Sequence, residues 1–134
     1  MGVLSKDECE ARQQVMLEHY VGTVEIEAKC MVVMLRKHVI PSAINGALHE
    51  EVTELQQGVI DLEASIAKIH AAETPGAAAR IARELRLEQM EAVRAIADFV
   101  EADVPALMWN LPTYADMLFL DQTTNDASMG VESY

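Results

Sequence analysis

The sequence is poor in aromatic residues, in basic residues and in cysteine, and each shortage excludes a class of protein. Phe, Trp and Tyr make up 4% of the 134 residues, whereas helix-favouring Ala, Leu, Glu and Met are abundant, so a sheet fold is disfavoured. Lys and Arg number 10 against 22 Asp and Glu, and the net charge of −12 would repel a nucleic acid or an anionic membrane surface. Cys9 and Cys30 lie too far apart along one expected helix to bond, which favours a reducing compartment.

Long apolar runs are also missing. The longest, Cys30 to Leu35, is stopped by Arg36 and Lys37, so no segment approaches the roughly 20 residues of a membrane span. Within this run we expect Cys30 to be buried as a small hydrophobic residue. The N-terminus, Met1 to Glu8, turns acidic at once and is typical of neither a secretory signal nor an Arg-rich transit peptide. We therefore expect a cytoplasmic protein, or a protein of the plastid stroma from which a transit peptide has been removed.

The motifs of common catalytic and metal sites are absent. The six Gly are scattered singly, which excludes a phosphate-binding loop, and there is no Gly-x-Ser-x-Gly elbow. A di-iron site in a helical bundle needs Glu-x-x-His on two helices, and no two His lie one turn apart for zinc. The residues three positions before the four His are not acidic: Met16, Leu35, Gly46 and Ala67. We therefore assign no catalytic, cofactor-binding or metal-binding residue.

A first long helix is predicted to begin at Ser5. Ser5 and Glu8 have the spacing of a capping box, in which each side chain accepts a hydrogen bond from a free backbone N–H. Pro41 is expected to end or kink this helix because it lacks a donor and clashes with the preceding turn. The result is a rod of roughly 50 Å, long enough to project from a small domain or span a neighbour. Its apolar seam has heptad spacing: Leu17, Val21, Val24, Ala28, Met31, Leu35 and His38.

Two further helices follow. The second is predicted to restart at Pro41 or Ser42 and to end at Glu73 to Gly76. Its seam again alternates steps of four and three: Leu48, Val52, Leu55, Val59, Leu62, Ile66 and Ile69. The third is predicted over 75–103, with Thr74 as N-cap and Pro75 at the first helical position. Its apolar stripe is wider, which indicates contacts on two sides: Ile81, Leu85, Met90, Val93, Ile96, Ala97, Phe99 and Val100.

These elements predict an all-α fold, an antiparallel three-helix bundle with long helices and short connections. Pro105 and Pro112 break the helical pattern, and the segment around Trp109 and Tyr114 is expected to pack back on the bundle. Residues 1–120 would form this single domain, and the polar residues 121–134 a flexible tail. The expected packing or interface residues are Leu17, Val21, Met31, Leu35, Trp109, Pro112, Tyr114, Leu118 and Phe119.

Two stretches resemble one known family. The first contains Glu18-His19-Tyr20-Val21, Val24-Glu25-Ile26-Glu27-Ala28 and Arg36-Lys37-His38-Val39-Ile40-Pro41-Ser42-Ala43; the second is Trp109-Asn110-Leu111-Pro112-Thr113-Tyr114-Ala115-Asp116-Met117-Leu118-Phe119. Both resemble the C-terminal helical region of type III glutamine synthetases, and the resemblance extends from about Arg12 to Phe119. The second stretch is the more specific, because rare residues recur in order. Asn110 departs from the family, which more often has a second proline there.

The resemblance implies a structural role. The family's enzymes join ammonia to glutamate with ATP and Mg²⁺ or Mn²⁺, in large rings, and their catalytic elements lie in an upstream barrel. No residue here matches those elements, so the chain is expected to be non-catalytic and without cofactor, and to contact a protein partner or further copies of itself through its helix faces. It is either a domain of such an enzyme or a stand-alone scaffold or linker subunit derived from it. An enzyme in its own right is the third and least supported reading.

Overall fold

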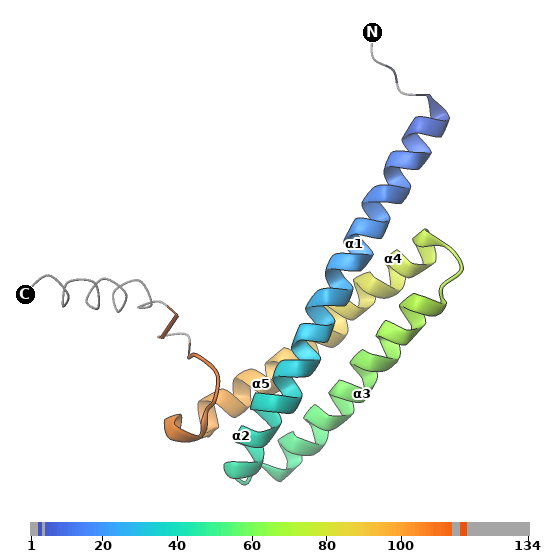
Figure 1. Cartoon of the computed structure of the whole chain (residues 1–134). Coiled ribbons are helices and arrows are strands. Elements are labelled where there is room, and N and C mark those ends of the chain that lie inside the picture. Colours follow the sequence, from blue (N-terminus) through green and yellow to red (C-terminus); the bar gives the residue numbers. More distant parts are fainter. Residues whose placement is uncertain (1–2, 4, 114–115, 118–134) are drawn as a thin grey trace, which may run out of the picture.

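The computed structural model describes residues 3, 5–113 and 116–117, and over these residues it is helical without strands (Figure 1). Three long helical rods follow one another along the chain. The expected all-α class is therefore confirmed. Among the residues expected to pack, Tyr114, Leu118 and Phe119 lie outside the described residues, as does the predicted tail 121–134.

The first rod begins with helix α1, Lys6–Met34, and its start is the predicted one. The Ser5 hydroxyl accepts a hydrogen bond from the Glu8 backbone N–H at 3.2 Å, and the Glu8 carboxylate accepts one from the Ser5 N–H at 3.1 Å. Both halves of the capping box are thus formed, because the two side chains lie three residues apart on the first turn.

The prediction that Pro41 separates the first helix from the second is wrong. Helix α1 continues through a π-helical turn, η1 (Leu35–Val39), into α2 (Ile40–Asn45), and Pro41 lies inside this run. In the π turn the Ile40 N–H donates to the carbonyl of Leu35, five residues back. This wider turn lies where a regular helix would press a carbonyl against the proline ring, so the rod continues past the proline.

The second rod is therefore a single helix that starts later than predicted. Helix α3 spans His49–Ala71, after a turn in which Ala47 adopts a left-handed φ of 59°. The turn is held by the Leu48 N–H, which donates to the Ala43 carbonyl at 3.0 Å. Gly46 is required there because a Cβ atom would lie 2.9 Å from the Cγ2 of Val104.

The third rod has the predicted bounds but not the predicted regularity. It consists of α4 (Pro75–Glu84), a second π turn η2 (Leu85–Gln89) and α5 (Met90–Asp103). The Thr74 hydroxyl caps it by accepting from the Ala77 N–H at 3.2 Å, as expected. A short 3-10 helix, η3 (Ala106–Met108), follows the rod.

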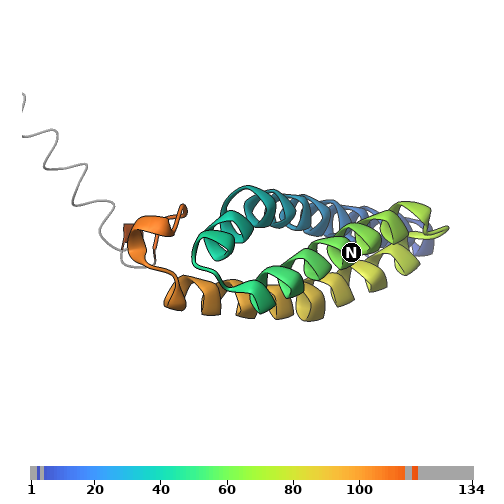
Figure 2. The same ribbon diagram turned by 90° about the horizontal axis from the view of Figure 1, so that it is seen from below.

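The core lies between the three rods, which run side by side (Figure 2). The predicted seams supply most of it. All seven seam residues of the second rod are buried or half-buried, from Leu48 to Ile69. The fully buried hydrophobic side chains come from every rod: Val24, Ala28, Ala43, Leu55, Leu62, Ala82, Leu85 and Val100.

The first turns of α1 reach beyond the other rods. Residues 5–16 are all exposed, and Figure 1 shows this part of the helix extending past the start of α4. We call residues 5–16 the arm. Its exposure agrees with the expectation of a rod too long for its own domain.

Candidate interaction surfaces

An apolar groove lies where α5 diverges from the first rod. It has a volume of about 410 Å³ and is lined by side chains of α1, η1, α5 and the segment after η3. The apolar lining residues are Met31, Met34, Leu35, Val39, Val93, Ala97, Trp109, Leu111, Pro112 and Met117. Only Arg94, Asp98 and Glu101 add charge, and they come from α5. A lining of this kind suits the packing of an apolar segment.

Trp109 and Leu111 bring the C-terminal segment against the rods. Both side chains are half-buried and pack on the core. The indole Nε1 of Trp109 is buried and has no hydrogen-bond partner among the described residues. Since an unpaired buried donor costs free energy, apolar packing of the ring must outweigh this loss.

A small capping motif follows Trp109 and was missed in the sequence. The Thr113 N–H donates to the Asp116 carboxylate at 3.0 Å, and the Asp116 N–H donates to the Thr113 hydroxyl at 3.2 Å. The Thr113 backbone N–H, and after it the Thr113 side chain, lower the pKa of the Asp116 carboxyl. The Thr-x-x-Asp spacing was the available signal, because it is the spacing of the capping box at Ser5.

The remaining packing candidates on the first rod fall into two groups, those that line the groove and those that do not. Met31 is half-buried, Leu35 is buried, and both line the groove together with Trp109 and the exposed Pro112. Val21, nearer the N-terminus of α1, is half-buried and packs against the core. Leu17 is half-buried at the base of the arm, where it is distant in sequence from the groove.

Cys30 is exposed, contrary to the expected burial. It lies two residues from each of the buried residues Ala28 and Val32. Two residues correspond to about 200° around a helix, so Cys30 faces away from the core. Cys9, on the arm, is exposed as well.

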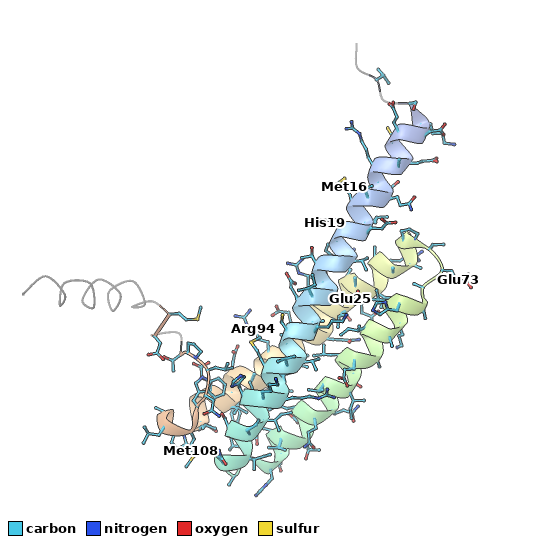
Figure 3. All side chains as sticks on the ribbon, viewed as in Figure 1. Met16, His19, Glu25, Glu73, Arg94 and Met108 are labelled. Atoms are coloured by element: carbon cyan, nitrogen blue, oxygen red, sulfur yellow. The ribbon has the colours of Figure 1, made fainter. Side chains whose placement is uncertain are left out.

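A polar cluster joins the first two rods, and Figure 3 shows its Glu25 on the side of α1 that faces α3. The carboxylate of Glu25 on α1 lies 2.8 Å from Nε2 of His70 on α3 and also accepts from Nζ of Lys29. The hydrogen bond from Lys29 is the main cause that lowers the pKa of Glu25, and His70 lowers it further, while burial opposes them. His70 is 45 residues from Glu25, so helix periodicity alone gave no signal for this pair.

Two other ion pairs connect the first rod to its neighbours. Arg36 lies 2.8 Å from Glu63 on α3, and Arg86 on η2 lies 3.6 Å from Glu27. All four side chains are substantially exposed, so each pair stabilises the fold by at most about 1 kcal/mol. Within the described part of the chain, no three His, Cys, Asp or Glu side chains gather in a way that could hold a metal ion. No helix there is long and apolar enough to cross a membrane.

The comparison with known proteins found a similarity in the N-terminal part of the chain. No curated protein matches the sequence significantly. A family model described as the glutamine synthetase C-terminal domain matches residues 1–56. The matched residues comprise the arm, the rest of the first rod and the start of α3, and they include the first of the two stretches on which the resemblance was based. Over residues 1–56 this chain is therefore similar to the C-terminal domain of glutamine synthetases, as the sequence had indicated.

Proposed function

We propose that this chain is a non-catalytic structural and oligomerisation domain of the type III glutamine synthetase kind. The observation that carries the proposal is the family match over residues 1–56, because it falls on a rod whose arm extends beyond its own core. A helix that continues past the core it belongs to is built to contact something outside that core.

In this proposal the three rods act as one antiparallel bundle. Two short connections, at 46–48 and 72–74, support this arrangement, since short loops join helices that are antiparallel neighbours. The C-terminal segment closes one end, where Trp109 and Leu111 pack on the core.

Chemistry would belong to residues outside this chain. ATP and Mg²⁺ or Mn²⁺ are expected only in a full-length parent enzyme, with the catalytic barrel upstream. The apolar lining of the groove supports a packing role, because a nucleotide or metal site needs convergent polar groups. The cytoplasm and the plastid stroma are both compatible with this role.

A stand-alone scaffold or linker subunit is the second candidate. It is favoured by the exposed arm, which could bridge to another assembly without a catalytic barrel attached. The genomic reading frame separates the two candidates: coding sequence for a barrel directly upstream means a domain of the enzyme, and its absence means a separate subunit.

The non-catalytic role is tested by assaying the purified chain for glutamine formation from glutamate, ammonium, ATP and Mg²⁺. A full-length type III glutamine synthetase serves as positive control. We expect no glutamine above the background without protein. Turnover proportional to the concentration of this chain would contradict the proposal.

A further inference from the structure

Helix α1 is apolar on two opposite sides. Its inner side carries the buried residues Val24, Ala28 and Val32. On the other side Val15, Ile26 and Val33 are exposed, at 64%, 65% and 48% respectively. An exposed apolar stripe of this length on a helix marks a contact surface.

The three exposed residues and the half-buried Gly22 follow a heptad. Val15 and Gly22 lie seven residues apart, Ile26 follows after four more and Val33 after another seven. Such spacing keeps side chains on one face of a helix. We call Val15, Gly22, Ile26 and Val33 the outer stripe. In Figure 2, α1 forms one edge of the molecule and the other two rods lie on the same side of it, so the opposite side is open.

The outer stripe is complementary to itself when reversed. Two α1 helices laid antiparallel and centred on residue 24 bring Val15 opposite Val33 of the other copy and Gly22 opposite Ile26. A Cβ atom at Gly22 would meet nothing within 4 Å, so the space above this residue is free to receive the larger isoleucine. Small residues allow helix backbones to approach closely, and a large side chain opposite a small one fills the interface.

The flanking charges are complementary in the same arrangement. Glu18 and Lys29 lie on the same flank of the outer stripe, and the reversal about residue 24 brings the Glu18 of each copy next to the Lys29 of the other. In an antiparallel pair, residues on the same flank of the two helices face each other, so two ion pairs form. Both side chains reach solvent on that flank. Lys29 also pairs with Glu25 of its own helix and Glu18 accepts from Gln14, so the Lys29 ammonium would bridge Glu25 and the Glu18 of the other copy.

From these observations we propose that a second copy of this chain docks on the outer stripe, antiparallel and centred on residue 24. This inference rests on the proposed assembly role and assigns to it a surface and a partner. The core of each copy stays on the far side of its own α1, so the pairing leaves both bundles intact.

The first test is the oligomeric state by sedimentation velocity over a range of protein concentrations. We expect a monomer–dimer equilibrium, and Ile26→Lys should raise the dissociation constant by at least about tenfold because a buried apolar contact becomes a charge. Ile60→Lys is the matched control, since Ile60 is 57% exposed but lies on α3 away from the outer stripe. A wild-type chain that stays monomeric, or an Ile26→Lys variant that dimerises like wild type, would overturn the proposal.

The direction of pairing is tested by disulfide cross-linking in a Cys9→Ser, Cys30→Ser background, in which no native thiol remains. Val15→Cys and Val33→Cys variants are oxidised separately and as a mixture. We expect a cross-linked dimer only in the mixture, because each new thiol faces the other position in the partner. Efficient cross-linking of Val15→Cys with itself would instead indicate parallel helices and refute the register.

The charge flank is tested by reversal. Glu18→Lys should weaken the dimer, and Glu18→Lys with Lys29→Glu should restore part of the affinity. An equal loss in the single and double variants would contradict the ion pairs. Failure of all three tests would leave the proposed structural role intact, because that role is decided by the turnover assay and the reading frame.

Discussion

Gly58 lies where α3 packs closely against Val93 of α5. A Cβ atom placed on it would come 2.7 Å from Cγ2 of Val93, a buried β-branched side chain with little freedom to move. Glycine in the middle of a helix costs about 1 kcal/mol relative to alanine. This position retains glycine because the two rods touch there.

Gly58→Ala should therefore lower the free energy of unfolding. Overpacking a core costs about 1–3 kcal/mol, which outweighs the gain of about 1 kcal/mol in helix propensity. Gly76→Ala is the matched control, because a Cβ there meets nothing within 4 Å and the position lies outside the outer stripe, so the substitution should be neutral or stabilising. The stabilities of the two variants are compared by their midpoints of urea denaturation. Equal stabilisation by both substitutions would mean that α3 and α5 do not pack as closely as the structure shows.

Glu25 links the first rod to the second, and the fold favours its charged form. Its folded pKa lies below the ordinary value of 4.5. A lowered carboxylate pKa adds stability that is fully present above the unfolded pKa and is lost as pH falls through the folded pKa. The stabilising effect of Glu25 should thus be full well above pH 4.5 and be lost as the pH falls from there through the lower folded pKa.

Glu25→Gln tests this dependence. The variant should be less stable than wild type at pH 7, and the difference should shrink as the pH is lowered below the ordinary pKa of glutamate. Glu63→Gln is the control, since its pair with Arg36 is more exposed, 43% against 17% for Glu25, and its removal should matter less. Melting temperatures measured from pH 7 to pH 3 give the answer; a Glu25→Gln difference that is independent of pH would refute the assignment.

At the scale of the elements, the capped helix starts could be predicted, whereas the end of the first rod and the turns inside the rods could not. The caps at Ser5 and Thr74 follow from residues three positions apart, so local sequence determines them. The two π turns have no comparable local signature. The first lies just before Pro41, where it makes room for the proline ring, and the second begins at Leu85 with no proline after it, so no common pattern of neighbouring residues marks the two positions.

Trp109 packs the C-terminal segment against the rods, and its substitution tests this packing. Removing a buried aromatic ring costs about 3–5 kcal/mol, and because Trp109 is only half-buried, Trp109→Ala should cost at most about 3 kcal/mol. Trp109→Phe should be much closer to wild type, since it keeps most of the packing and removes the unpaired indole N–H.

The loss of stability in the two variants is measured by thermal unfolding. Trp109 is also the only Trp in the chain, so the wild-type fluorescence spectrum reports on its surroundings directly. A blue-shifted emission that moves to the red on unfolding is expected. An unchanged melting temperature for Trp109→Ala, together with the emission of a solvated indole, would place the segment off the rods in solution.

The whole molecule carries a large excess of negative charge. A net charge of −12 on 134 residues repels itself, and the repulsion acts on the folded chain more than on the expanded unfolded one. Added salt shortens the screening length to about 10 Å at 0.1 M, so it relieves this repulsion. The few exposed ion pairs lose little in return.

The melting temperature should therefore rise as NaCl is added from low ionic strength. Glu54→Gln removes one exposed charge from α3 and should raise the melting temperature at low salt while reducing the response to salt. Stability that falls on addition of salt would show that ion pairs such as Arg36–Glu63 outweigh the net repulsion.

The sequence by itself determined the helical class, the start of the first helix, both ends of the third and the seams that form the core. These features depend on periodicity and on contacts within one or two turns. Only the tertiary structure decided the continuation through Pro41, the Glu25–His70 pair, the close approach of Gly58 to Val93 and the apolar groove. Each of these depends on how the rods are rotated and spaced relative to one another, and that is fixed by side-chain packing between residues far apart in the chain.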